Sequence, residues 1–222
     1  MSAGSTDTGS TGTGSMDAGD FAAWIRRTAG RVSADAERLT RLDAAIGDGD
    51  HGLNLDRGFR AAVEALPEDA PPGKVLIAAG RAIVSKTGGA SGPLYGTVLR
   101  RAGKSFGDAA GVDAAALGAA LRAALEGVQD LGKAAEGDKT MVDALAPAVA
   151  AYEAALAGGS DLAGCARAAA EAASKGADGT VPMRARKGRA SYLGERSEGH
   201  MDPGASSTAL VLEALADTAG EG

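Results

Sequence analysis

Residues 43–54 read DAAIGDGDHGLN, and this polar, glycine-rich stretch joins the end of one predicted helix to the start of the next. Before it, apolar residues follow helical spacing from a candidate N-cap at Asp20 through Trp24 and on to Ile46. The pattern stops at Gly47. A short break between two periodic segments favours two helices that pack side by side in opposite directions.

Working outward from this junction, the same alternation of alanine-rich segments and Gly/Pro breaks continues along the chain. Alanine and leucine favour helix, whereas the β-branched alternation of strands is scarce. We therefore expect an all-α fold, an eight-helix antiparallel up-and-down barrel or bundle. Its helices are predicted at about 20–46, 54–65, 74–87, 94–106, 113–128, 139–157, 160–174 and 205–218. A mixed α/β fold with a strand at residues 74–84 is the alternative, although βαβ alternation is absent.

The break at residues 175–204 is long and rich in Gly, Arg and Lys. A loop of about 30 residues within a compact domain is unusual and is often functional. We expect this stretch to form a lid. At the other end of the chain, residues 1–19 form a Gly/Ser/Thr tract that is typical of a flexible tail, so the domain is predicted over residues 20–222.

Charge and cysteine content limit the classes of partner. With 23 basic and 29 acidic residues the net charge is −6, which argues against a nucleic-acid or anionic-membrane surface. No apolar run approaches the roughly 20 residues of a membrane span, and the N-terminus lacks the features of a signal peptide. The single cysteine, Cys165, lies in an apolar helical segment and is expected to be buried. One cysteine without a partner fits a reducing cytoplasm.

Three aspartates, Asp43, Asp48 and Asp50, lie within eight positions at the first junction. Carboxylates held this close repel each other unless a cation lies among them. Hard, oxygen-preferring ions such as Mg²⁺ suit the arrangement, and phosphate oxygens commonly complete their coordination. The alternative is that these residues only form turns and helix caps. The spacing does not match an EF-hand calcium loop.

A second polar break, residues 87–97, reads TGGASGPLYGT. Its glycines permit close approach of backbone N–H groups to an oxyanion, Ser91 adds a hydroxyl, and Pro93 suits the start of a helix. An anion site at a helix N-terminus is one interpretation of this stretch, and an ordinary turn is the other.

Two further segments carry candidate functional residues. Residues 132–143 read GKAAEGDKTMVD, where the glycine spacing resembles a Walker A loop, but Asp138 interrupts the motif and no strand precedes it. We therefore reject a P-loop, while Met141 could pack on an aromatic ring such as adenine or in the core. Residues 187–207 place Arg189, Arg196, His200 and Asp202 in one loop, which suits phosphate binding opposite an acidic metal cluster or a solvated surface loop.

Together and in this order, the four segments resemble the nucleotide-binding L subunits of dihydroxyacetone kinases (DhaL). The resemblance covers about residues 20–220 and is carried by LTRLDAAIGDGDHG, GGASGPLYGT, GDKTMVDAL and GRASYLGERSEGHMDPGAS. It implies a helical barrel of eight antiparallel helices that binds ADP and two Mg²⁺ ions at one end.

The resemblance also implies a role for each motif residue. The magnesium ligands would be Asp43, Asp48 and Asp50. The phosphate-side contacts would be His51, Gly52, Leu53, Asn54, Ala90 and Ser91. The adenine pocket would include Gly132 and Met141, and the lid over the nucleotide would include Arg189, Asp202, Pro203 and Gly204.

In this family's phosphotransferase-system form, bound ADP is phosphorylated to ATP by a phosphohistidine carrier subunit (DhaM-like). The phosphoryl group then passes to dihydroxyacetone on a separate K subunit (DhaK-like). The length of the chain leaves no room for a K domain and favours this arrangement over an ATP-dependent kinase, and a homodimer is expected. A regulatory adaptor of a transcription factor and a kinase subunit for another keto-sugar remain alternatives. His51 and His200 are candidate phosphohistidines by residue type, although ligand or structural roles are favoured.

Overall fold

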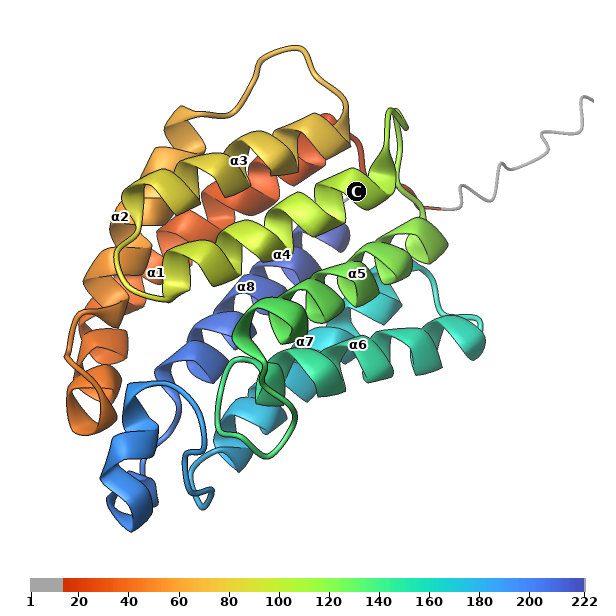
Figure 1. The fold of residues 1–222 in the computed structure, drawn as a ribbon. Coiled ribbons are helices and arrows are strands. Elements are labelled where there is room, and N and C mark those ends of the chain that lie inside the picture. Colours follow the sequence, from red (N-terminus) through yellow and green to blue (C-terminus); the bar gives the residue numbers. More distant parts are fainter. Residues whose placement is uncertain (1–13, 222) are drawn as a thin grey trace, which may run out of the picture.

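The computed structural model describes residues 14–221, and this part of the chain folds into eight α-helices and one 3-10 helix with no strand (Figure 1). The all-α prediction is confirmed. The alternative strand at residues 74–84 is wrong, because these residues lie in the third helix. In chain order the elements are α1 (Ala18–Ile46), α2 (His51–Glu64), α3 (Pro72–Lys86), α4 (Ser91–Phe106), α5 (Ala114–Gly132), α6 (Val142–Ala157), α7 (Leu162–Gly179), η1 (Arg189–Ser197) and α8 (Pro203–Ala219).

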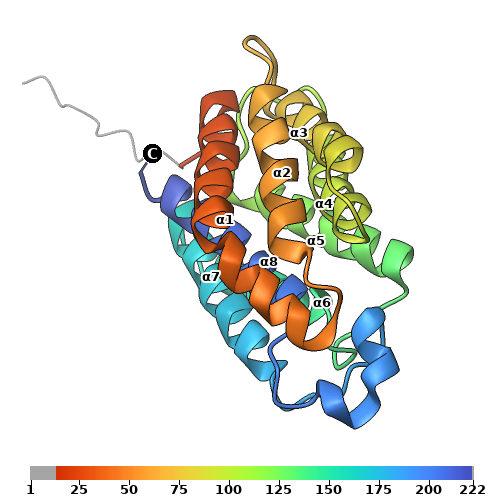
Figure 2. The same cartoon turned by 90° about the vertical axis from the view of Figure 1, so that its left-hand side faces the viewer.

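The helices form a closed up-and-down arrangement. Each α-helix packs on the next one in the chain, and α8 returns to pack on α1 (Figures 1 and 2). The indole Nε1 of Trp24 in α1 donates a hydrogen bond to the carbonyl of Val211 in α8 at 3.0 Å, which ties the closing pair together. Short connections between antiparallel neighbours explain this topology.

Small residues allow close packing between neighbouring helices. A Cβ added at Gly73 in α3 would lie 2.5 Å from the carbonyl oxygen of Gly103 in α4, so only glycine fits this contact. Large apolar side chains fill the interior, where Phe21, Phe59 and Tyr152 are almost completely buried. Because consecutive helices run in opposite directions, the α1–α2, α3–α4, α5–α6 and α7–α8 connections lie at the same end of the barrel.

Helix α1 begins earlier than the predicted N-cap at Asp20. Asp17 caps α1 and forms a capping box with Asp20, in which each carboxylate accepts the other residue's N–H at 2.8–3.0 Å. Met16 is buried and exchanges two 2.9 Å backbone hydrogen bonds with Val112. Residues 1–13 of the expected tail lie outside the described residues. The sequence pattern therefore predicted the N-cap of α1 three residues too late, at Asp20 instead of Asp17.

The predicted lid is partly helical. Helix α7 continues to Gly179, and the 3-10 helix η1 lies between α7 and α8 at one end of the barrel (Figure 2). We call residues 181–200 the lid segment. Cys165 is buried, as expected. None of the helices in the described part of the chain combines the length and apolar character that a bilayer span requires.

Candidate functional site

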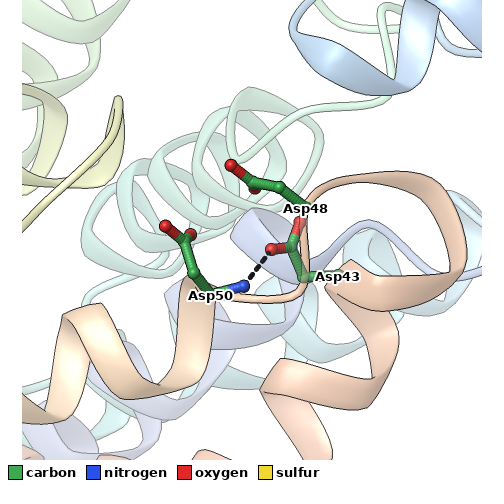
Figure 3. Close-up of side chains that lie close together, drawn as sticks. All are labelled: Asp43, Asp48 and Asp50. Carbon is green, nitrogen blue, oxygen red and sulfur yellow. Dashed lines mark hydrogen bonds between the residues drawn. The ribbon is translucent and has the colours of Figure 1, made fainter.

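The three aspartates of the first junction converge. Asp43 lies in the last turn of α1, Asp48 in the connection, and Asp50 at the N-cap of α2. One carboxylate oxygen from each lies within 4.8 Å of the others (Figure 3). Gly49 makes the turn possible with a φ of +73°, a region that side chains rarely adopt.

Backbone hydrogen bonds hold the cluster in this shape. The Asp43 Oδ2 atom accepts the backbone N–H of Asp50 at 2.9 Å (Figure 3) and also that of His51 at 3.2 Å. The Asp50 carboxylate makes no capping hydrogen bond to its own helix, so it is left for another ligand. A set of three oxygen donors with two exposed members fits a hard divalent cation such as Mg²⁺.

A cavity of about 340 Å³ opens beside the aspartates, within the size range of small-molecule sites. It brings together all but three of the residues that the sequence analysis assigned to the site. Those that line it are Asp43, Asp48, Asp50, His51, Ala90, Ser91, Gly132, Met141, Arg189, Asp202, Pro203 and Gly204.

Gly52, Leu53 and Asn54 do not line this cavity. The Leu53 side chain is 63% exposed, and a Cβ at Gly52 would lie 1.9 Å from the carbonyl oxygen of Ala36, because α2 packs on α1 there. Asn54 is buried, accepts a hydrogen bond from Arg57 at 2.6 Å and donates its backbone N–H to Asp50. The N–H of Asn54 is therefore not available to a ligand.

His51 is held between two hydroxyl groups. Its Nε2 lies 2.9 Å from the Oγ of Ser207, and its Nδ1 lies 3.4 Å from the Oγ of Ser91. Burial lowers the pKa of His51, so the neutral imidazole is favoured. His200, the other candidate phosphohistidine, is exposed and does not line the cavity. These contacts suit a positioning role for His51 better than a covalent one.

The glycine-rich break forms a second helix N-terminus at the cavity. Helix α4 begins at Ser91, three residues earlier than predicted, with Ala90 as its N-cap and Gly89 at a φ of +65°. No side chain caps these first N–H groups. The unpaired N–H groups and the helix dipole favour an anion at this position.

Less polar residues line another part of the cavity. Met141 is 5% exposed, and the cavity lining there also includes Leu94, Val128 and Gly132. The Asp143 carboxylate shapes the preceding loop, since it accepts the N–H of Gly137 at 2.5 Å and that of Thr140 at 2.7 Å. This surface suits a flat apolar ring, whereas the aspartate side suits phosphates.

The lid segment and the start of α8 complete the cavity. An Nη2 of Arg189 lies 3.1 Å from the Asp48 Oδ2, so the lid segment reaches the acidic cluster. Asp202 caps α8 by accepting the N–H of Ala205 at 2.7 Å, and burial raises its pKa to about 7. Pro203 follows as the first residue of that helix. The guanidinium of Arg189 and the carboxylates of Asp48 and Asp202 therefore border the same cavity.

Among the cavity residues that the sequence did not single out, Tyr95 and Lys139 make the most specific polar contacts. Tyr95 is buried, its hydroxyl bonds to Ser207 at 2.7 Å, and burial raises its pKa to about 12. Lys139 is buried with a φ of +62°. Both lie within motifs that the sequence analysis identified, but neither residue type indicated its contacts.

Comparison with known proteins agrees with this geometry. The DAK2 domain family model matches residues 45–217. The ADP-binding subunit DhaL of the PEP-dependent dihydroxyacetone kinase of Escherichia coli K12 is 42% identical over 200 residues, 89% of this chain and 95% of that subunit. The D-erythrulose kinase of Mycolicibacterium smegmatis is 43% identical over 189 residues, 83% of this chain and 33% of that enzyme.

Solved structures show the same fold. The dihydroxyacetone kinase of C. freundii in complex with AMP-PNP and Mg²⁺ superposes with a TM-score of 0.65 at 27% identity, covering 98% of this chain. The native form gives a TM-score of 0.67 at 26% identity, and this chain spans 38% of the length of that kinase chain. On the family match and the identity to DhaL subunits, the chain belongs to the DAK2 domain family.

Proposed function

We propose that this chain is the ADP-binding subunit of a dihydroxyacetone kinase, which accepts a phosphoryl group on bound ADP and passes it to dihydroxyacetone on another subunit. The observation that carries the proposal is the convergence of three carboxylates beside a cavity with a less polar inner surface. Supporting it is the alignment to the E. coli DhaL subunit, which covers 95% of that protein.

In this proposal Asp43, Asp48 and Asp50 hold two Mg²⁺ ions. When bound, these ions neutralise charge on the phosphates of the nucleotide. The Asp43 carboxylate also accepts the backbone N–H groups of Asp50 and His51 and thereby fixes the start of α2. The convergence of three acidic groups supports a cation site, since three carboxylates within 4.8 Å of each other repel strongly without one.

The chain's own donors hold the phosphate oxygens. The uncapped N–H groups at the N-terminus of α4 and the hydroxyl of Ser91 are oriented before the ligand arrives, so little reorganisation accompanies transfer. Arg189 of the lid segment supplies a positive charge opposite the aspartates. Gly132 and Met141 form the pocket for the adenine ring. No covalent nucleophile of this chain takes part, since the phosphoryl group is carried by the nucleotide.

The partners in this proposal are two proteins. A phosphohistidine carrier subunit (DhaM-like) gives its phosphoryl group to ADP and forms ATP. A K subunit (DhaK-like) binds dihydroxyacetone, whose hydroxyl then takes the phosphoryl group and restores ADP. We also propose a homodimer and action in the cytoplasm. The acceptor pocket belongs to the K subunit, and the similarity to a D-erythrulose kinase makes D-erythrulose the second candidate acceptor.

Nucleotide retention tests this function. The purified chain should keep stoichiometric ADP and Mg²⁺ through dialysis, and radiolabel from the phosphorylated carrier should move to ADP and then to dihydroxyacetone when a K subunit is added. If the chain releases nucleotide freely and supports turnover of added ATP with a K subunit alone, it is an ATP-dependent kinase subunit instead. If it binds no adenine nucleotide, the proposal is wrong.

A further inference from the structure

The ammonium group of Lys139 contacts both ends of the lid segment, residues 181–183 and 197–200, which we together call its neck. The side chain is 1% exposed, and its Nζ lies 3.0 Å from the carbonyl oxygen of Met183, 2.6 Å from that of Ser197 and 2.5 Å from that of His200. The carbonyl oxygen of Val181 lies a little farther away, at 3.5 Å. The lid segment begins at Val181 and ends at His200, so one side chain joins its two ends.

This contact depends on a positive charge. A lysine ammonium has three donors and no acceptor, which matches several carbonyl oxygens that converge on one point. Without the ammonium these oxygens would face each other with no donor between them. Burial lowers the pKa of Lys139, while the nearby Asp202 and Glu198 favour its charged form. A neutral side chain of similar length would fill the space but leave the carbonyl groups unsatisfied.

The backbone directs this side chain inward. Lys139 adopts a φ of +62°, a left-handed conformation that is uncommon for residues other than glycine. Two backbone hydrogen bonds hold the same region: Arg186 donates to Asp138 at 3.0 Å, and Gly199 donates to Val181 at 2.8 Å. The lid segment is therefore attached to the loop after α5 at its neck, and Lys139 supplies the charged part of that attachment.

The attachment links opposite sides of the candidate site. Thr140 and Met141, the residues after Lys139, line the cavity on the proposed adenine side. Arg189, carried by the lid segment, lies against Asp48 on the phosphate side. Because the Nζ hydrogens are directed at carbonyl groups, Lys139 is not free to bind a phosphate in the manner of a P-loop lysine.

We propose that Lys139 is a positioning residue that latches the lid segment closed, and that this latch sets how long a bound nucleotide stays in the cavity. The inference rests on the proposed function for the identity of the ligand. The latch itself rests on the contacts of Lys139 alone. Loss of the ammonium would remove a contact shared by both ends of the lid segment and leave the backbone hydrogen bonds Arg186–Asp138 and Gly199–Val181 to hold it, so Arg189 would be held less firmly.

The test compares Lys139→Met with Lys133→Met in the full chain. Lys133 lies in the same loop, is exposed and also has a positive φ, of 49°, so it controls for loss of a lysine from this backbone. The dissociation rate of a fluorescent ADP analogue is measured in the presence of Mg²⁺. We expect release at least about tenfold faster from Lys139→Met and unchanged release from Lys133→Met. Equal rates for wild type and Lys139→Met would overturn the proposal.

Chemical rescue separates the charge from a general packing effect. Cys165→Ala removes the other thiol, and Lys139→Cys in that background is alkylated with 2-bromoethylamine while unfolded and then refolded. The product restores an ammonium at nearly the original length and should restore slow release. Alkylation with iodoacetamide supplies a neutral group and should not. Rescue by both reagents would assign the effect to packing and overturn the latch.

The wild-type protein supplies a measurement that needs no variant to fold. Acetylation of lysines by an N-hydroxysuccinimide ester, followed by mass spectrometry, should modify Lys139 far more slowly than Lys133, and Mg-ADP should slow the reaction of Lys139 further. A separate test does use the variant: trypsin cleavage in the lid segment after Arg184 and Arg186 should be faster in Lys139→Met than in wild type even without nucleotide. If wild type binds no adenine nucleotide, the proposed function fails, whereas equal reaction rates for Lys139 and Lys133 would overturn the latch whatever the ligand is.

Discussion

Replacing Asp202 with asparagine should change how the stability of this protein depends on pH. Asp202 is buried at the N-terminus of α8, where its carboxylate accepts the N–H of Ala205 at 2.7 Å. Burial is the main cause that raises its pKa to about 7; the cap contact with the Ala205 N–H opposes the rise, Asp143 adds to it, and Lys139 opposes it. The side chain therefore binds a proton in the folded state at pH values where the unfolded chain has lost it.

The sign and size of the effect follow from this difference. A carboxyl group with a folded pKa of about 7 and an unfolded value near 3.8 contributes its full stability below about pH 4. That contribution is lost as the pH rises through 7. A difference of about 3 in pKa corresponds to about 4 kcal/mol, of which roughly 2.5 kcal/mol is lost between pH 5 and pH 8. Asparagine is neutral throughout and is nearly as good an N-cap.

Urea denaturation followed by far-UV circular dichroism measures the effect, at pH 5, 6.5 and 8 without nucleotide or divalent ions. Relative to wild type, Asp202→Asn should gain about 2.5 kcal/mol in free energy of unfolding from pH 5 to pH 8. Asp161→Asn is the matched control, because Asp161 caps α7 with the same contact, to the N–H of Gly164 at 2.7 Å, but is exposed. A constant difference between Asp202→Asn and wild type across the three pH values would refute the reasoning.

Three further substitutions test the site and the packing. Asp48→Asn should leave the helical content intact but weaken Mn²⁺ binding, followed by electron paramagnetic resonance, by about tenfold or more, since one of three charged ligands is lost. Gly52→Ala should lower the free energy of unfolding by about 1–3 kcal/mol in urea, because its Cβ would lie 1.9 Å from the Ala36 carbonyl oxygen. Tyr152→Phe should cost about 1 kcal/mol in the same assay, because the hydroxyl donates to the carbonyl of Ala114 at 2.9 Å; a loss below 0.3 kcal/mol would contradict that contact.

The helices were predictable because alanine-rich periodic segments alternate with Gly/Pro breaks, but several ends were misplaced, and for two of them the structure gives the physical reason. Helix α4 begins at Ser91, ahead of Pro93, because the missing N–H of a proline costs nothing in the first turn. Helix α7 continues past Gly176, which the sequence suggests as a break. A Cβ there would lie 2.2 Å from the carbonyl oxygen of Asp143, so this glycine serves packing between α7 and α6. Sequence cannot distinguish a packing glycine from a terminating one.

The sequence predicted the site residues whose chemical type alone indicates a role. It did not predict contacts that depend on where a side chain points in the folded protein. Asp43 and Ser91 belong to motifs whose residue types indicate cation and anion binding. Leu53 belongs to the first motif too, but successive helical residues point about 100° apart, so its side chain faces solvent. Lys139 and Tyr95 bind backbone and hydroxyl groups from distant segments. Those contacts exist only once the lid segment and α8 are in place.

The members of the acidic cluster are not equivalent. Asp43 is fixed by two backbone N–H groups, so a cation would not have to order its side chain. Asp48 instead lies against Arg189, whose guanidinium neutralises part of the repulsion among the aspartates. A cation at Asp48 and the lid arginine therefore compete for one carboxylate, and any phosphate beside the cation offers Arg189 a replacement partner. Binding of metal and nucleotide must then be coupled to the position of the lid segment, which is the position that Lys139 controls at its neck.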